Sequence, residues 1–258
     1  MLFKYGDVVQ LGNHRLACGD SADEWVVKKL VQEDKIKSVI CDPPYGVDYV
    51  SGKNSFWQGV GQDEIEHKPI KNDAITSDSQ YFKFSSDWLE AIKPHLADKN
   101  SIYSFSADKM IFPLRDALMA SGFHFGQLLV WVKNNSVLGR LDYLPQHEMI
   151  IYGWLGTHEF LKSKDKSLLY YCPKPNKSKL HPTMKPIHLL RRLILNSTSI
   201  GDYVFDGFGG SGSTLLACEQ TKRKCLMVEL DPEYCEVICQ RFETLTGIKP
   251  ETIESLNI

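Results

Sequence analysis

The chain has 258 residues, of which 43% are hydrophobic and 24% charged, and its formal net charge is −2. These proportions are typical of a globular protein and exclude a wholly disordered chain, a collagen and a coiled coil. The near-neutral charge argues against a protein that coats nucleic acid over its whole surface, but it permits a local basic face. Because no segment has the ~18 to 20 apolar residues that span a bilayer and no apolar signal core stands near the start, we expect a cytoplasmic protein with no membrane partner.

The seven cysteines are odd in number and form no C-x-x-C pair. Cys235 and Cys239 lie four residues apart in a segment expected to be helical, but no second pair completes a zinc site. We therefore expect buried, reduced thiols, with no metal and no disulfide.

The first half of the chain alternates short strands and helices. Apolar alternation around Gly12 and Asn13 predicts a hairpin over residues 7–18, and helical spacing follows over 22–31. Residues 36–41 have the pattern of a buried parallel strand, which two prolines end abruptly. Residues 46–80 show neither the apolar spacing of a helix nor the alternation of a strand. A stretch of this length without periodicity is expected to be a functional loop. Helices are predicted over 81–93 and 109–120, on either side of a strand at 101–105.

The second half begins with two β-rich segments, 125–132 and 149–152, which we expect to form an antiparallel pair at one edge of the sheet. Strands and helices then alternate, with helices at 186–197, 213–220 and 232–244 and strands at 203–205 and 225–228. Such alternation is typical of a parallel sheet covered on both faces. We predict one doubly wound α/β domain over residues 1–258, with a mostly parallel sheet and insertions at about 46–80 and 154–180.

A glycine-rich turn follows the predicted strand at 203–205 and contains Gly207, Gly209, Gly210 and Gly212. Its spacing fits neither the dinucleotide fingerprint nor the phosphate-binding P-loop. Asp206 precedes the turn and Glu229 ends the next strand, where a carboxylate can accept the hydroxyls of a ribose. Acidic side chains here suit a cationic ligand without phosphate, and S-adenosylmethionine has these properties.

A second candidate site is the tetrad Asp42-Pro43-Pro44-Tyr45, which also follows a predicted strand. The prolines fix φ at two successive residues and remove two amide donors, which leaves carbonyls as acceptors. The Asp42 carboxylate, the Pro43 carbonyl and the Tyr45 ring would form a cup for a planar group that bears an amino substituent. A Pro-Pro pair after a strand is otherwise only a chain stop.

Three motifs now stand in order along the chain: the tetrad, His181-Pro182-Thr183-Met184-Lys185-Pro186, and residues 206–214. Together they resemble the β class of DNA amino-methyltransferases of phage or restriction-modification type. The resemblance implies a Rossmann-like, S-adenosylmethionine-dependent fold with a circularly permuted motif order. Gly207 departs from the family, which usually has proline at this position.

The resemblance assigns roles by position. The tetrad Asp42, Pro43, Pro44 and Tyr45 would be catalytic. The cofactor would contact Asp20, Cys41, Thr183, Lys185, Asp206, Phe208, Gly209, Gly210, Gly212 and Glu229. Two of these residues have plain alternatives, since Lys185 could be a solvated lysine before a helix and Asp20 could be a helix cap.

The implied chemistry is methyl transfer to the N6 amine of adenine. That amine is a weak nucleophile because its lone pair is delocalised into the ring, and hydrogen bonds to Asp42 and the Pro43 carbonyl would free the pair. The base must leave the duplex to reach such a pocket. We expect Cys41 to pack in the strand rather than to act as the nucleophile of a cytosine-C5 enzyme.

Duplex DNA is the expected partner, because residues 162–192 contain nine basic residues against Asp165 alone. Polar and aromatic residues after the tetrad could fill the gap left by a flipped base or read groove edges. The predicted DNA contacts are Lys53, Phe56, Trp57, Lys133, Asn134, Arg140, Lys174, Lys177 and Lys179.

Several alternatives stay open at this stage. Cytosine-N4 is the nearest one, and RNA or protein-glutamine methylation uses a related tetrad that normally begins with asparagine. A DNA-binding module with a relict cofactor pocket is the non-enzymatic alternative. Because 154–180 is short for a recognition domain, we expect a homodimer that shares recognition, and the existence of a cognate restriction endonuclease is left open.

Overall fold

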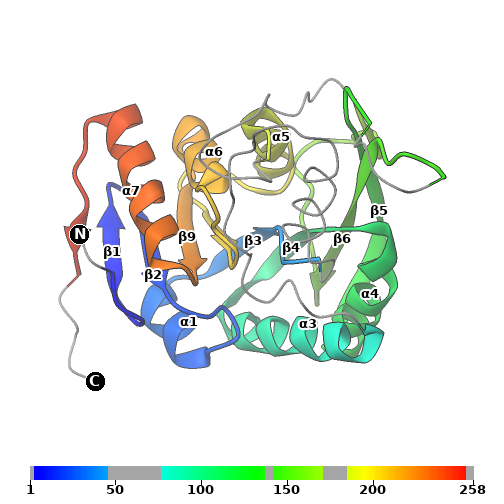
Figure 1. Ribbon diagram of the computed structural model, residues 1–258, viewed down its shortest axis with the longest axis horizontal. Helices are drawn as coiled ribbons and strands as arrows, with labels where there is room; N and C mark the ends of the chain where they lie inside the picture. Colours follow the sequence, from blue (N-terminus) through cyan, green and yellow to red (C-terminus); the bar gives the residue numbers. More distant parts are fainter. Residues whose placement is uncertain (1–2, 46–76, 137–141, 171–184, 254–258) are drawn as a thin grey trace, which may run out of the picture.

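A computed structural model describes residues 3–45, 77–136, 142–170 and 185–253. Within them, one sheet of ten strands runs through the molecule, with the order β10-β1-β2-β9-β8-β3-β4-β6-β5-β7 (Figure 1). The central neighbours from β2 to β4 are parallel, and antiparallel pairs flank them on both sides. This confirms the doubly wound α/β fold. Residues 46–76 of the expected loop lie outside the described residues, and helix α3 (Asp78–Ile92) begins within the last part of that loop.

The predicted N-terminal hairpin is confirmed as β1 (Val8–Leu11) and β2 (His14–Cys18). Gly12 between them has φ +59°, which a glycine adopts without strain. Helix α1 (Glu24–Val31) follows, and the side chain of Asp23 caps it by accepting from the Trp25 amide.

The parallel core of the sheet consists of β3 (Ile36–Cys41), β4 (Leu96–Ser106), β8 (Tyr203–Asp206) and β9 (Lys224–Glu229). β3 pairs with β4 on one side and with β8 on the other. From β3 the chain continues to β4, whereas from β8 it continues to β9 in the opposite direction. The β3–β8 boundary is therefore the topological switch point, where open α/β sheets bind ligands.

The antiparallel part is formed by β5 (Phe123–Val132) and β6 (His147–Leu155). Their pairing at one side of the sheet is confirmed: β6 also pairs with β4, and among the described residues the short β7 (Leu168–Leu169) extends the edge by pairing with β5. At the other edge β10 (Glu251–Thr252) pairs with β1. Strands of two residues carry no periodicity that a sequence could reveal.

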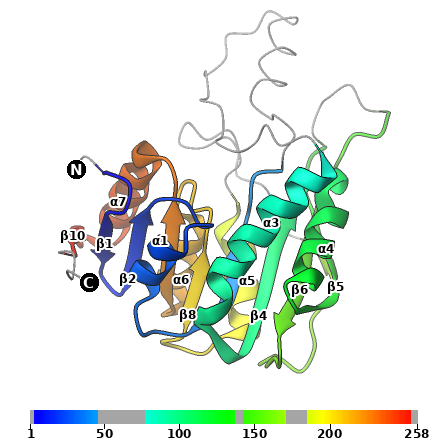
Figure 2. The ribbon, with the colours of Figure 1, turned by 90° about the horizontal axis from the view of Figure 1, so that it is seen from below.

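Helices cover both faces of the sheet. One face carries α1, α3 (Asp78–Ile92) and α4 (Ile111–Ala120), and the other carries α5 (Ile187–Ser197), α6 (Ser213–Thr221) and α7 (Pro232–Thr246). In Figure 2, α3 and α4 lie in front of the sheet and α5 and α6 behind it. Single turns, η1 (Lys93–His95) and η2 (Asp108–Met110), precede β4 and α4.

Each face has its own apolar core, one including Val27 and Trp88, the other Leu193 and Phe242. Helix α5 shows why the sequence folds this way, since its leucines and isoleucine at 189, 190, 193 and 194 form one buried stripe. Among the helices of the described residues, none combines the length and the apolar character needed to cross a membrane.

Candidate active site

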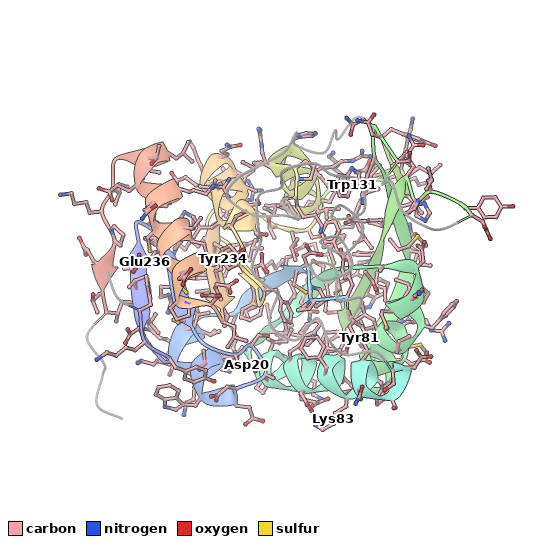
Figure 3. The ribbon with its side chains drawn as sticks, viewed as in Figure 1. Asp20, Tyr81, Lys83, Trp131, Tyr234 and Glu236 are labelled. Carbon is pink, nitrogen blue, oxygen red and sulfur yellow. The ribbon has the colours of Figure 1, made fainter. Side chains whose placement is uncertain are left out.

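The two predicted motifs meet at the switch point of the sheet. Val39 of β3 is paired with Phe205 of β8, so the tetrad and the glycine turn leave neighbouring parallel strands at the same edge. Figure 3 shows Asp20 and Tyr234 in the left half of the molecule and Tyr81 and Trp131 in the right half. The structure therefore brings together two motifs that stand about 160 residues apart in the chain.

The tetrad is held by hydrogen bonds among its own side chains and Lys185. The Tyr45 hydroxyl donates to Asp42 Oδ1 at 2.5 Å. The Lys185 ammonium donates to Asp42 Oδ2 and lies 3.2 Å from the Tyr45 hydroxyl. It also lies 5.0 Å from the centre of the Phe105 ring. Both oxygens of the Asp42 carboxylate are thus occupied by donors of the protein itself.

A second carboxylate, Glu148 of β6, belongs to the same cluster. Its Oε1 lies 2.7 Å from the Lys133 ammonium, and its Oε2 lies 3.2 Å from the Lys185 ammonium and 3.3 Å from the Tyr45 hydroxyl. Sequence reasoning missed Glu148, because it stands in no motif and its partners are far away in the chain. The one signal it offered is an acidic residue near the start of a strand whose predicted partner strand is followed directly by a lysine.

The charges of this cluster shift one another. Burial raises the pKa of Asp42 above its ordinary value; the Lys185 ammonium opposes the rise and Glu148 adds to it. Burial would also raise the pKa of Glu148, but Lys185 and Lys133 outweigh it and lower the pKa to about 2. Burial would lower the pKa of Lys185, yet the two carboxylates raise it. Lys185 and Glu148 are therefore both charged at neutral pH.

The glycine turn is built by backbone conformations that favour glycine. Gly210 has φ +51° and Gly212, the residue before α6, has φ +80°. A Cβ on Gly209 would lie 2.8 Å from Met227, and one on Gly207 would lie 3.0 Å from the Cβ of Ser21. Ser21 therefore leaves little room for a side chain at position 207, where this chain has glycine and the family usually has proline.

Two buried carboxylates border this turn. Asp206 accepts from the Phe208 amide at 3.0 Å, and burial raises its pKa to about 6. Glu229 accepts from the amides of Gly210 at 2.6 Å and Asp231 at 2.8 Å, and burial raises its pKa to about 7. Neither forms an ion pair with any other described residue, so each would gain from a donor or a cation that a ligand supplies.

Asp20 lies beside Glu229, because the amide of the preceding Gly19 donates to the Glu229 carbonyl at 2.9 Å. Its carboxylate accepts from the Ala22 amide at 2.9 Å and so closes a turn, but the cap of α1 is Asp23. The alternative that Asp20 caps the helix is therefore wrong.

The remaining predicted cofactor contacts are placed as follows. The Phe208 ring packs against Phe84 and Trp88 of α3, with ring centres 5.9 and 5.7 Å apart. Cys41 is buried, and its thiol lies 3.7 Å from the Ser104 hydroxyl; burial holds its pKa well above the ordinary value, which leaves it a thiol. Thr183 lies outside the described residues.

The predicted DNA contacts are only partly described. Lys53, Phe56, Trp57, Arg140, Lys174, Lys177 and Lys179 lie outside the described residues. Asn134 is exposed at the end of β5. Lys133 is buried and paired with Glu148, so its expected contact with DNA is corrected: the ammonium lies against that carboxylate and not at the surface.

Comparison with known proteins agrees with this geometry. The family model for DNA methylases of the N6/N4 type matches residues 36–240, which include the tetrad and the glycine turn. The chain belongs to the N6/N4 DNA methylase family. This confirms the resemblance drawn from the three motifs.

Individual relatives of this N6/N4 DNA methylase are distant. The Type II methyltransferase M.HpaI of Haemophilus parainfluenzae is 26% identical over 264 aligned residues, covering 90% of this chain and 75% of the relative. Among solved structures, the PvuII cytosine-N4-specific DNA methyltransferase is 17% identical with a TM-score of 0.70 (99% and 92% coverage). The M1.HpyAVI–SAM complex is 23% identical with a TM-score of 0.63 (88% and 98% coverage). At these identities, the solved structures confirm the fold.

Proposed function

We propose that this N6/N4 DNA methylase transfers a methyl group from S-adenosylmethionine to the N6 amine of an adenine that has been flipped out of duplex DNA. The observation that carries the proposal is the pairing of β3 with β8, which sets the Asp42 tetrad beside the glycine turn. A pocket for an amine and a pocket for a methyl donor must share a wall if the transfer is to be direct. The single domain, the homodimer and the cognate nuclease stay predictions.

The residues around the glycine turn fit S-adenosylmethionine by their chemistry. The ligand offers an ammonium, a sulfonium and two ribose hydroxyls, all of which favour carboxylate partners. Asp206 and Glu229 are buried carboxylates without a counter-ion among the described residues, and the Ser213 hydroxyl is buried there without a partner. Glu229 would hold the ribose hydroxyls, Asp206 would face the cationic part, and Asp20 would lie near the amino-acid end.

In this proposal the chain's own groups orient the amine. Asp42 and the Pro43 carbonyl would accept the two amine hydrogens, and the Tyr45 ring would stack on the base. The bound donor supplies an electrophilic methyl group, whose bond to sulfur breaks with its electron pair on sulfur as the N–C bond forms. Asp42 is placed to pass on the proton that the methylated amine loses.

The test is nucleoside mass analysis after incubation of the protein and labelled S-adenosylmethionine with unmethylated genomic DNA. We expect N6-methyladenine as the product, and none with heat-denatured protein. N4-methylcytosine alone would overturn the adenine assignment while leaving the family intact. Transfer to RNA or to a protein, with none to duplex DNA, would overturn the DNA substrate itself.

A further inference from the structure

Four charged side chains alternate in sign through the interior of the site: Lys133, Glu148, Lys185 and Asp42. The side chains of Lys133 and Lys185 are 7% exposed, that of Glu148 13%, and that of Asp42 23%. Two ammonium groups balance two carboxylates, and removing one member leaves an uncompensated buried charge. Lys133 directly follows β5, Glu148 lies in β6, Lys185 precedes α5 and Asp42 follows β3.

Lys185 occupies the place that the proposed mechanism requires for the amine. Its ammonium donates to Asp42 Oδ2, while Tyr45 occupies Oδ1. An ammonium has three N–H donors, and those of Lys185 face Asp42, the Tyr45 hydroxyl and Glu148. When an amine takes Oδ2, the Lys185 ammonium must keep another anionic partner, and Glu148 is already in contact.

We propose that Glu148 is a positioning residue of the methyl-transfer site: it retains Lys185 when the target amine displaces that lysine from Asp42. This inference rests on the proposed function. Lys185 keeps Asp42 paired while the pocket holds no base, and Glu148 lets Lys185 release Asp42 without carrying a buried charge alone. Lys133 fixes the other oxygen of Glu148, so the carboxylate cannot turn away from Lys185.

The first test is single-turnover methylation by Glu148→Gln, which keeps the side-chain volume and removes the charge. Without an alternative anion, Lys185 stays on Asp42 and competes with the amine, so we expect the rate at neutral pH to fall roughly 10- to 100-fold. The affinity for S-adenosylmethionine should stay within about twofold, because Glu148 lies in the tetrad half of the site.

The second readout is the acidic limb of the pH–rate profile, which reports the ionisation of Asp42. The titratable or charged groups around Asp42 are Cys41, Tyr45, Tyr81, Lys133, Glu148, Lys185 and Asp206. Removing the negative charge of Glu148 lowers the pKa of Asp42, so the limb should move to lower pH in Glu148→Gln. Removing the positive charge in Lys185→Met should move it to higher pH.

The matched control is Glu159→Gln. Glu159 also pairs with two lysines, Lys37 at 2.9 Å and Lys99 at 3.6 Å, but it is 40% exposed and its partners stand near the starts of β3 and β4, away from the tetrad. We expect this variant to keep the wild-type rate and the wild-type position of the acidic limb of the pH–rate profile. Glu148→Asp keeps the negative charge, so the acidic limb should return to its wild-type position and the methyl-transfer rate should be partly restored.

The outcomes separate the two proposals. If wild-type protein transfers no methyl group to DNA, the proposed function fails. If it does, and Glu148→Gln keeps the wild-type rate with an unmoved limb, the role of Glu148 fails alone. Should Glu148→Gln not fold, the double variant Lys133→Met/Glu148→Gln removes the unpaired lysine as well; its acidic limb should shift in the same direction but by less, because a positive charge is lost together with the negative one.

Discussion

The two halves of the active site hold their carboxylates in opposite ways. Asp42 is paired with the Lys185 ammonium, which Glu148 shares, whereas Asp206 and Glu229 accept backbone amides and form no ion pair within the described part of the chain. Burial therefore raises the pKa of Asp206 to about 6 and that of Glu229 to about 7. By contrast, Lys185 and Lys133 lower the pKa of Glu148 to about 2.

This difference matches the two ligands that we propose. A neutral amine brings no charge of its own, so its acceptor depends on the protein for a counter-ion, and Lys185 supplies one that opposes the rise in the pKa of Asp42 caused by burial. A cationic cofactor brings its own positive charge, so the glycine half can leave its carboxylates without a counter-ion until the cofactor binds. Each half can be tested separately.

The largest effect is expected from Asp42→Ala. Because Asp42 is the acceptor for the amine, methyl transfer should fall by about 10²- to 10³-fold or more, while the affinity for S-adenosylmethionine changes little. Labelled methyl transfer and calorimetry measure the two quantities. Asp87→Ala, which removes an exposed carboxylate of α3, is the control. Near-normal turnover in Asp42→Ala would remove this residue from the mechanism.

An intermediate effect is expected from Glu229→Gln. We expect the cofactor affinity to fall roughly 10-fold or more, since a charged acceptor for the ribose hydroxyls is lost. In the wild type the affinity should rise with pH through about 7 and then level off, because Glu229 has its pKa near 7 and binding favours its ionised form. One proton is then released on binding below that pH.

Calorimetry in buffers of different ionisation heat measures that proton. Glu229→Gln should release less of it, whereas Glu90→Gln, which changes an exposed carboxylate of α3, should behave as the wild type. A pH-independent wild-type affinity between pH 5 and 8 would show that neither buried carboxylate of the glycine half titrates with the cofactor.

The smallest effect concerns lysines inside and outside the site. Reversing the charge of Lys174 and Lys177 should weaken DNA binding and reduce the salt slope by about 2, if each contacts one phosphate. Lys133→Gln should leave that slope unchanged, because the Lys133 ammonium is buried against Glu148. The affinity for DNA of both variants is measured at several salt concentrations. An unchanged slope in the Lys174/Lys177 variant would show that these two lysines do not contact phosphates.

Much of the fold could be predicted because its strands and helices have regular apolar periods. The strand β3 was predicted with its observed bounds, since it is buried and ends at two prolines. The strand β4 begins five residues earlier than expected, because three polar residues at 98–100, two of them exposed, interrupt its apolar pattern after Ala97. Periodicity detects buried segments and misses such extensions.

The site was predictable where local chemistry is concentrated in a short segment. The tetrad and the glycine turn are such segments, and the structure brings them together as expected. Glu148 and the true setting of Lys133 were not predictable, because their meaning arises from strand pairing between β5 and β6 and from a lysine 37 residues further along. A lone charged residue on a strand gives no indication of its partners.

The Lys185 ammonium beside Asp42 has a consequence for inhibitor design. A compound that offers a cation to Asp42 meets an ammonium already in contact with that carboxylate, and the two positive charges repel. A neutral amino heterocycle avoids this repulsion, and an acidic substituent directed at Lys185 would gain a partner. Drug-like molecules that target the tetrad should therefore be neutral or acidic, whereas those that target the glycine turn should be basic.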